Sequence, residues 1–267
     1  MKKLLCAVSL ALGVSGFAIA DSLDNAINNA QRTADYQARD QYRHPKQTLE
    51  FFGIKPDMTV VEVSPGGGWY TEILAPYLKD SGTYYAAGFD PESEVKYYQN
   101  AHKRFSEKLA ANPEMYGNVK VSIFQPPHKL DIAPAGSADM VLTFRNVHNW
   151  YMNGGEENLL ASFKAFAKAL KPGGVLGVVE HRLPADRPES DQQRSGYMHQ
   201  ALVVRIAEQA GFTLAAESDV NANPKDTADH PKGVWTLPPS LRLGDEDKAK
   251  YQAIGESDRM TLKFVKK

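Results

Sequence analysis

Residues 60–74 of this chain read VVEVSPGGGWYTEIL. A short β-branched segment leads into three consecutive glycines, Gly66, Gly67 and Gly68, and apolar residues then recur at helical spacing. Glycine lets a backbone approach a ligand closely, and a helix that begins after such a turn directs free N–H groups toward anionic groups. The stretch therefore predicts a strand–loop–helix unit with a binding site at its turn.

The rest of the chain alternates between strand-like and helix-like segments. Strands are expected at residues 59–63, 83–90, 119–124, 138–145, 175–180, 212–217 and 259–265. Helices are expected at 45–53, 69–78, 94–111, 158–170 and 197–210, with one or two amphipathic helices over 21–43 and a turn over 171–174. This alternation predicts an α/β fold with a doubly wound, seven-stranded and mostly parallel sheet.

The first twenty residues have the pattern of a signal peptide. Lys2 and Lys3 precede a mostly apolar run over residues 4–17, and Ala18-Ile19-Ala20 forms a small-x-small site before Asp21. The pattern predicts export and cleavage, with an uncleaved anchor as the alternative. We expect a single domain over residues 21–267, with a helical lead-in at 21–48 and no stable membrane anchor after cleavage.

Charge and cysteine content exclude several classes of function. The chain has 31 basic and 32 acidic residues, and removal of the leader takes away two lysines and no acids. A slightly acidic chain without a basic run is not expected to bind nucleic acid. The single cysteine, Cys6, lies in the leader, so the mature protein has no disulfide and no thiolate ligand or nucleophile.

Three pieces of sequence carry a resemblance to a known family. They are the glycine loop with Asp90 after the next strand, Asp139-Met140-Val141-Leu142, and the stretch LKPGGVL at residues 170–176. From about residue 49 to 265 the chain resembles class I S-adenosylmethionine-dependent methyltransferases. The resemblance implies a Rossmann-like methyltransferase fold with one antiparallel edge strand, S-adenosyl-L-methionine as cofactor and a small-molecule acceptor.

The signal peptide and the stretch FRNVHNW at residues 144–150 narrow this resemblance. Together they resemble a group of signal-peptide-bearing bacterial predicted methyltransferases, which implies a periplasmic location.

The resemblance also implies the residues that hold the cofactor. Gly66, Gly67 and Gly68 would approach the methionine end, and Glu62 matches the acidic residue that ends the family's first strand. The sequence departs from the family at Ser64-Pro65. The proline fixes its own φ and removes one N–H donor from the loop. The methionine end is therefore expected to be held in a different way, and an unliganded strand–helix turn is the alternative.

Later segments complete the expected cofactor site. Asp90 is expected to accept hydrogen bonds from the ribose hydroxyls, although Asp-Pro is also an ordinary turn. Phe89 would flank the adenine and Gln125 would contact its amino group, with core packing and a plain proline-rich loop as the alternatives. Arg145, at the end of the fourth strand, is included in this cofactor-binding set.

Candidate catalytic residues follow the fourth and fifth strands. Methyl transfer requires alignment of the acceptor and, for some acceptors, removal of a proton. His148 is the expected base, His181 is the reserve base, and Trp150 and Tyr151 would shape the acceptor side. Structural roles in a loop or at a strand end are the alternatives. Arg182 is a candidate for binding an anionic acceptor.

Two long segments are candidates for covering the pocket. Residues 183–196 are predicted to form a mobile loop over the pocket. Residues 221–256 are predicted to form either a substrate lid or a structural excursion between two edge strands. The other histidines lack ligand spacing, so no metal site is expected.

Two further function classes stay open. One is a non-catalytic exported module that binds a small molecule or a partner. The other is a nicotinamide-dependent oxidoreductase, although Thr71 stands where the third glycine of G-x-G-x-x-G belongs.

Overall fold

A computed structural model describes residues 22–267. The expected signal peptide and its cleavage site lie outside these described residues, so both stay predictions. No helix within the described part of the chain combines the length and the apolar character that crossing a membrane would require.

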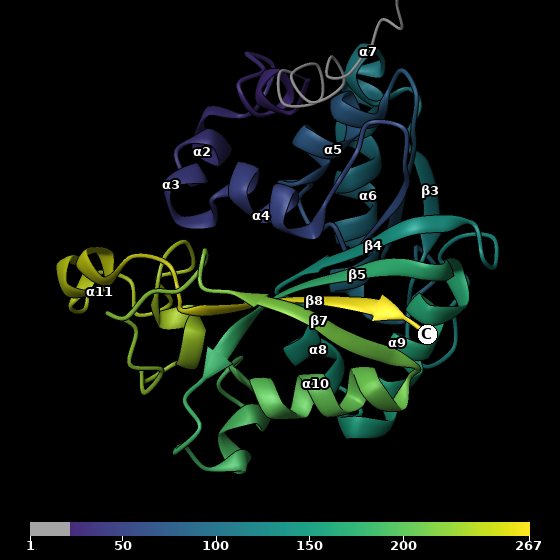
Figure 1. Cartoon of the computed structure of the whole chain (residues 1–267). Coiled ribbons are helices and arrows are strands. Elements are labelled where there is room, and N and C mark those ends of the chain that lie inside the picture. Colours follow the sequence, from purple (N-terminus) through teal and green to yellow (C-terminus); the bar gives the residue numbers. More distant parts are fainter. Residues whose placement is uncertain (1–21) are drawn as a thin grey trace, which may run out of the picture.

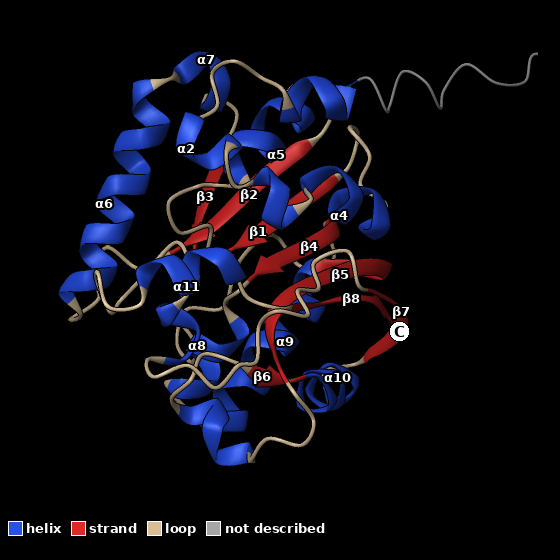
Figure 2. Cartoon of the chain, turned by 90° about the vertical axis from the view of Figure 1, so that its left-hand side faces the viewer, coloured by secondary structure: helices blue, strands red, loops and turns tan. Residues whose placement is uncertain are grey.

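The centre of the fold is an eight-stranded mixed sheet. Seven strands lie in the order β3-β2-β1-β4-β5-β8-β7, and a short β6 pairs with β5 (Figure 2). The strands are β1 (Thr59–Val63), β2 (Thr83–Gly88), β3 (Lys120–Ile123), β4 (Ala138–Phe144), β5 (Leu170–Leu183), β6 (Met198–His199), β7 (Phe212–Ser218) and β8 (Arg259–Lys266).

The strands from β3 to β5 pair in parallel, whereas β8 pairs antiparallel with both β5 and β7. The expected doubly wound, mostly parallel sheet is thus confirmed, together with its antiparallel part. The reversed strand β8 is not itself the edge, because it lies between β5 and β7. Its first residues are buried without alternation, as expected of an interior strand, whereas β7 alternates between buried or half-buried and exposed residues.

Helices cover both faces of the sheet (Figure 1). They are α2 (Ala34–Gln37), α3 (Asp40–Arg43), α4 (Pro45–Phe52), α5 (Thr71–Leu78), α6 (Lys96–Ala111), α7 (Pro113–Tyr116), α8 (Val147–Met152), α9 (Gly155–Ala169), α10 (Gln200–Gln209) and α11 (Lys248–Ile254). Residues 22–27 are also helical, and two 3₁₀ turns are η1 (Glu189–Gln193) and η2 (Gly233–Thr236).

Each face of the sheet has its own core. On one face, α4 packs over β5 and β8 and α5 packs over β2, with Phe52, Ile73 and Leu74 all fully buried. On the other face, α9 packs over β4 and β5 and α10 packs over β7, with Phe163 and Phe166 fully buried. Burial on both faces explains why the central strands are continuously apolar rather than alternating.

The structure differs from the expected elements in several places, and it also adds the short elements β6, α7 and α11. The lead-in over residues 22–43 forms three short helical pieces instead of one or two helices. Residues 171–174 are a bulge inside β5, because Ala138 pairs with Leu170 while Met140 already pairs with Val175. The segment after β4, expected as a loop, contains the helix α8.

We predict that Gly177→Ala lowers the stability of the protein. A Cβ at Gly177 in β5 would lie 2.7 Å from Leu142 Cδ2 and 2.8 Å from Phe52 Cδ2, and both side chains are fully buried. Such overpacking costs about 1–3 kcal/mol. Urea denaturation measures the free energy of unfolding.

Gly88→Ala is the matched control, because no atom lies within 4 Å of the Cβ position at that glycine in β2. Equal unfolding free energies for the two variants would contradict the tight packing of α4 on β5.

Candidate functional site

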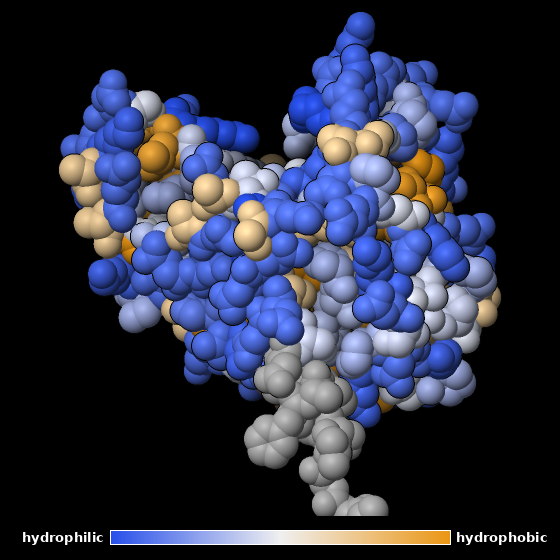
Figure 3. Space-filling view, turned by 90° about the horizontal axis from the view of Figure 1, so that it is seen from above, coloured by the Kyte–Doolittle hydropathy of each residue, from blue (hydrophilic) through white to orange (hydrophobic). Residues whose placement is uncertain are grey.

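A cavity of about 930 Å³ opens at the carboxyl edge of the parallel strands. Ser64 follows β1, Phe89 follows β2, Phe124 follows β3 and Arg145 follows β4, and all four line the cavity together with His181 of β5. Seen from above, the surface of the molecule is mostly hydrophilic and is hollowed between two lobes (Figure 3). The cavity is at the upper end of the size range of small-molecule sites.

The three glycines of the loop have different reasons for being glycine. Gly66 has a φ of 59° and open space at its Cβ position, so it leaves the cavity wall free. A Cβ at Gly67 would lie 2.5 Å from the Tyr36 hydroxyl oxygen, and one at Gly68 would lie 3.1 Å from Lys108 Cε. Gly66 and Gly67 line the cavity, whereas Gly68 does not. Gly68 allows close packing on α6, and its expected approach to the cofactor stays a prediction.

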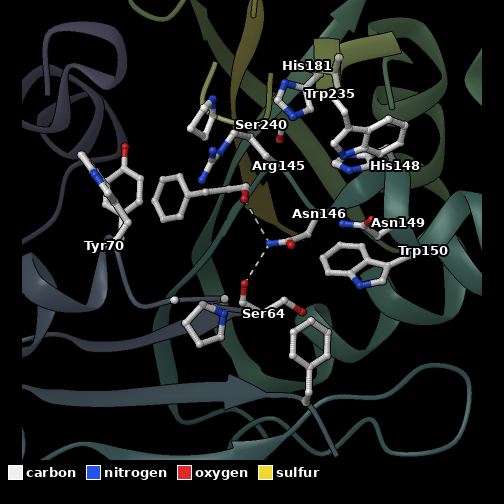
Figure 4. Close-up of a pocket in the computed structure, with 18 of the residues that line it drawn as sticks. Ser64, Tyr70, Arg145, Asn146, His148, Asn149, Trp150, His181, Trp235 and Ser240 are labelled. Atoms are coloured by element: carbon white, nitrogen blue, oxygen red, sulfur yellow. Dashed lines mark hydrogen bonds between the residues drawn. The ribbon is translucent and has the colours of Figure 1, made fainter. Parts of the chain in front are cut away.

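Asn146 ties the loop after β1 to the end of β4. Its Nδ2 donates to the backbone oxygens of Val63 (3.2 Å), Ser64 (3.3 Å) and Phe144 (3.2 Å). Figure 4 shows Asn146 in the middle of the cavity wall, between Ser64 and Arg145. The amide thereby fixes two strand ends relative to each other.

Glu62 lies at the end of β1, is 3% exposed and lines the cavity. Its carboxyl accepts hydrogen bonds from the Thr71 hydroxyl (3.0 Å) and from the Tyr84 hydroxyl. Burial raises the pKa of Glu62 to about 7, although both hydroxyls oppose that rise. The carboxyl therefore braces the glycine loop from below and changes its charge near neutral pH.

Asp90 follows β2 but is not part of the cavity wall. Its carboxylate accepts a hydrogen bond from the backbone N–H of Glu92 (3.0 Å) and forms an ion pair with Lys129 (2.8 Å). The Lys129 ammonium lowers the pKa of Asp90. A ribose role for Asp90 stays a prediction, and it requires the half-exposed Lys129 to give way.

Phe89 and Gln125 both line the cavity. Phe89 stacks on Tyr98, with 4.8 Å between the ring centroids. The side-chain oxygen Oε1 of Gln125 is buried and has no hydrogen-bond partner within residues 22–267. A buried acceptor without a donor is costly, so this oxygen is suited to an amino group of a bound ligand.

Arg145 has an unusual backbone and a free side chain. Its φ is 62°, a left-handed conformation that is rare for non-glycine residues, and its N–H donates to the Val179 oxygen at 2.7 Å. Within the described part of the chain its guanidinium makes no hydrogen bond and no ion pair, and it lines the cavity. Burial and the nearby Arg259 lower the pKa of Arg145 to about 10.

One fully buried carboxylate, that of Glu180, organises both candidate catalytic histidines. It accepts hydrogen bonds from the His148 backbone N–H (3.2 Å), from His148 Nδ1 (3.0 Å) and from the His181 backbone N–H (2.7 Å). With Nδ1–H donating to Glu180, the other ring nitrogen Nε2 of His148 keeps its lone pair, as a general base requires. No role was expected for Glu180 from the sequence, although its place beside His181 at a strand end was the available signal.

His181 lies beside His148, with 5.3 Å between the ring centroids, and its Nδ1 is 2.5 Å from the Ser257 hydroxyl oxygen. Burial, together with the neighbouring His148 and three arginines, lowers the pKa of His181 well below its usual value. His181 is therefore neutral at physiological pH. Both histidines line the cavity, so either ring can face an acceptor.

His148, Glu180 and His181 also place three metal-ligand atoms within 4.8 Å of one another. The expectation of no metal site rests only on the spacing of histidines along the chain. This cluster, by contrast, joins residues from two separate elements, α8 and β5. However, both oxygens of Glu180 already accept N–H hydrogen bonds. Its geometry matches a carboxylate that orients a histidine better than a carboxylate that ligates a metal.

Three expectations for the acceptor side are corrected. Tyr151 packs against the hydrophobic core and does not line the cavity, because successive residues of a helix point about 100° apart. Arg182 forms a two-point ion pair with Asp258 at 2.8 and 3.0 Å, away from the cavity. Residues 183–196 border a separate, smaller cavity of about 410 Å³. By contrast, Trp150 lines the main cavity as expected.

The structure adds residues that the sequence analysis did not assign. From the lead-in come Tyr36, Arg39 and Arg43; from the segment 221–256 come Trp235, Ser240 and Glu256. Figure 4 shows Trp235 beside His148 and His181. The segment 221–256 thus forms part of the wall, which is compatible with both a substrate lid and a structural excursion. No local sequence pattern marks these residues, because their elements meet only in the folded chain.

Comparisons with known proteins agree with this architecture. The family model described as a methyltransferase domain matches residues 35–217. Among curated proteins, none matches this chain.

Solved structures match over nearly the whole chain. A SAM-dependent methyltransferase from Aquifex aeolicus has a TM-score of 0.55 at 16% identity, covering 93% of this chain and 98% of the other. The N-methyltransferase NodS from Bradyrhizobium japonicum WM9, in complex with S-adenosyl-L-homocysteine, has a TM-score of 0.53 at 15% identity, with 92% and 97% covered. The [4+2]-cyclase SpnF has a TM-score of 0.58 at 16% identity, with 94% of each chain covered.

At these identities the solved structures establish the fold, which is the expected Rossmann-like methyltransferase fold. The family model covers more than half of the sequence, so the chain belongs to the methyltransferase domain family.

Proposed function

We propose that this protein transfers the methyl group of S-adenosyl-L-methionine to a small-molecule acceptor in the cell envelope. The observation that carries the proposal is the shared cavity. The glycine loop at one strand end and the His148–Glu180 pair at another line the same space. A cofactor and an acceptor bound there would meet in front of a histidine that Glu180 orients.

The lining residues fit the cofactor. Gly66 leaves open space beside the loop, and Phe89 offers a ring face for the adenine. The unpartnered Oε1 of Gln125 is suited to accept from the adenine amino group. The bound cofactor supplies a methyl group on a sulfonium, which an aligned nucleophile displaces. The complex of NodS with S-adenosyl-L-homocysteine supports this assignment by analogy.

His148 is the proposed general base. Glu180 orients the ring and holds Nδ1, so Nε2 is the atom that accepts a proton from the acceptor. His181 is the reserve base, and its low pKa makes it a weaker proton acceptor than an ordinary histidine. Trp150 and Trp235 supply apolar walls that exclude water from the acceptor.

A non-catalytic binding module is the second candidate. Two observations favour it: Lys129 engages the Asp90 carboxylate, and Pro65 removes an N–H from the loop. The fold itself does not decide between the candidates, because one similar structure is named as a cyclase.

We expect the purified mature protein to bind S-adenosylmethionine and S-adenosylhomocysteine, but not NAD, in calorimetric titrations. Loss of a charge-assisted hydrogen bond from Asp90 to the ribose costs about ten- to a hundred-fold in affinity. Asp90→Ala is therefore expected to weaken S-adenosylhomocysteine binding by that factor.

Lys129→Met is the control, because it breaks the ion pair but keeps the Asp90 carboxylate. An equal loss of affinity in both variants would show that Asp90 acts only through Lys129. Absence of binding by either adenosyl compound would contradict the proposed function.

We predict that His148→Ala lowers methyl transfer by about 10²–10⁴-fold, the usual effect of removing a general base. S-adenosylhomocysteine affinity should stay nearly unchanged, because the histidine faces the acceptor. The measurement is S-adenosylhomocysteine formation on a small-molecule extract of the producing cells.

His199→Ala is the matched control, since His199 lies outside the cavity wall. Full turnover by the His148→Ala variant, together with loss of turnover in the His181→Ala variant, would assign the role of general base to His181 instead of His148. Unchanged turnover in both would exclude a histidine base.

We also predict that the mature protein begins at Asp21 and occurs in the periplasm, because Ala18-Ile19-Ala20 precedes that residue. N-terminal sequencing of protein from fractionated cells provides the measurement. A chain that keeps Met1 and fractionates with the cytosol would contradict the assigned location.

A further inference from the structure

Arginines dominate the charge of the cavity wall. Among the described residues that line it, the cationic side chains are Arg39, Arg43, Arg145, Arg242 and Arg259, and the acidic ones are Glu62 and Glu256. Glu62 is bonded to Thr71 below the glycine loop, and its pKa of about 7 leaves it only partly charged at neutral pH. The wall therefore carries an excess of positive charge.

Three of these arginines converge on Glu256. Its carboxylate accepts from Arg39 Nε at 2.6 Å and from Arg43 Nε at 3.3 Å, and it also pairs with the Arg259 guanidinium. Arg43, Glu256 and Arg259 are each no more than 3% exposed. One carboxylate thus faces three guanidinium groups, and the neighbouring Arg145 forms no ion pair with a carboxylate among residues 22–267.

Several nitrogen atoms of this group have no acceptor. Arg39 Nη2, Arg43 Nη1 and Arg259 Nε are buried and unpartnered within the described chain. Arg145 is free and is held in a left-handed backbone conformation directly after β4. Arginines that are buried and unsatisfied destabilise a fold unless a ligand supplies the missing acceptors.

The cofactor alone does not balance this charge. The amino-acid end of S-adenosylmethionine is a zwitterion without net charge, and its sulfonium adds a further positive charge. Four guanidinium groups against Glu256 leave an excess of three positive charges. An anionic second ligand neutralises this excess, whereas a cationic acceptor would be repelled.

The arginines also lie beside the candidate bases. His181 pairs with Arg259 across β5 and β8, and Ser257, which is bonded to His181, precedes Arg259. Figure 4 shows Arg145 on the same side of Asn146 as His181, away from Ser64 of the glycine loop. The same positive charge disfavours a metal cation at the two histidines.

We propose that Arg39, Arg43, Arg145 and Arg259 bind a carboxylate or phosphate group of the methyl acceptor, so that the substrate is a small organic anion. This inference rests on the proposed function, because it assigns the acceptor class for that reaction. The planar guanidinium groups offer paired N–H donors that match the geometry of both anions.

The test titrates inorganic phosphate into the mature protein saturated with S-adenosylhomocysteine, so that the cofactor's own carboxylate already occupies its place. Calorimetry should detect phosphate binding. Arg145→Asn removes one charged donor and keeps a residue that tolerates a left-handed backbone, and it should weaken phosphate binding about ten- to a hundred-fold. Arg205→Gln is the control, because Arg205 pairs with Glu156 at the surface, and it should bind phosphate like the unchanged protein. Circular dichroism establishes that both variants fold.

Two results would overturn the proposal. The first is no phosphate binding, or equal binding by Arg145→Asn and the unchanged protein. The second is an Arg145→Asn variant that binds S-adenosylhomocysteine more weakly but binds 5′-methylthioadenosine, which lacks the amino-acid end, normally. That pattern would assign the arginines to the cofactor's carboxylate. If the protein binds no adenosyl compound but binds phosphate through Arg145, the anion site stands and only the proposed methyl transfer fails.

Discussion

Parallel pairing of β1 to β5 is the constraint on which the site depends. Parallel strands end at one edge of a sheet, so the residues that follow them must meet there. The loop with Gly66, the free Arg145 and the buried His181 reach the cavity in this way. The reversed strand β8 contributes to the same edge of the sheet, because its first residue, Arg259, pairs with His181 near the end of β5. A strand running backwards thus delivers its beginning, and the preceding Glu256 and Ser257, to the cavity.

Buried charges are the cost of this arrangement. Glu180 is fully buried and is compensated by three N–H donors, and Glu256 is compensated by three arginines. Removing one partner from such a buried group typically destabilises a protein by about 3–5 kcal/mol. The arginines nevertheless exceed the carboxylates. Departures of this kind from full compensation are expected at functional sites, where binding takes precedence over stability.

The family and the fold limit the reaction without defining it. The methyltransferase domain match covers residues 35–217, so the segment that carries Trp235, Glu256 and Arg259 lies beyond it. Similar solved structures include methyltransferases and a cyclase. Side chains from the segment before β8 therefore enter the cavity from outside the part of the chain that the family model covers.

The sequence by itself determined the layers of the fold and the edge that carries the site. Periodicity placed the five parallel strands to within a few residues, except at the start of β5, because continuous apolar runs between glycine turns are local signals. It also pointed to residues 66–68, His148 and His181, which lie close to the carboxyl ends of β1, β4 and β5. It missed α8, since the short run 147–152 has too few residues to show a helical period. Tyr151 was placed wrongly for the same reason.

Only the tertiary structure decided which side chains share the cavity. Arg39 and Glu256 are separated by more than two hundred positions, yet they form an ion pair of 2.6 Å. Asp90, by contrast, has the expected position after β2 but turns to Lys129. Local patterns report what the backbone does over a few residues, whereas the partner of a charged side chain depends on segments that only folding brings together.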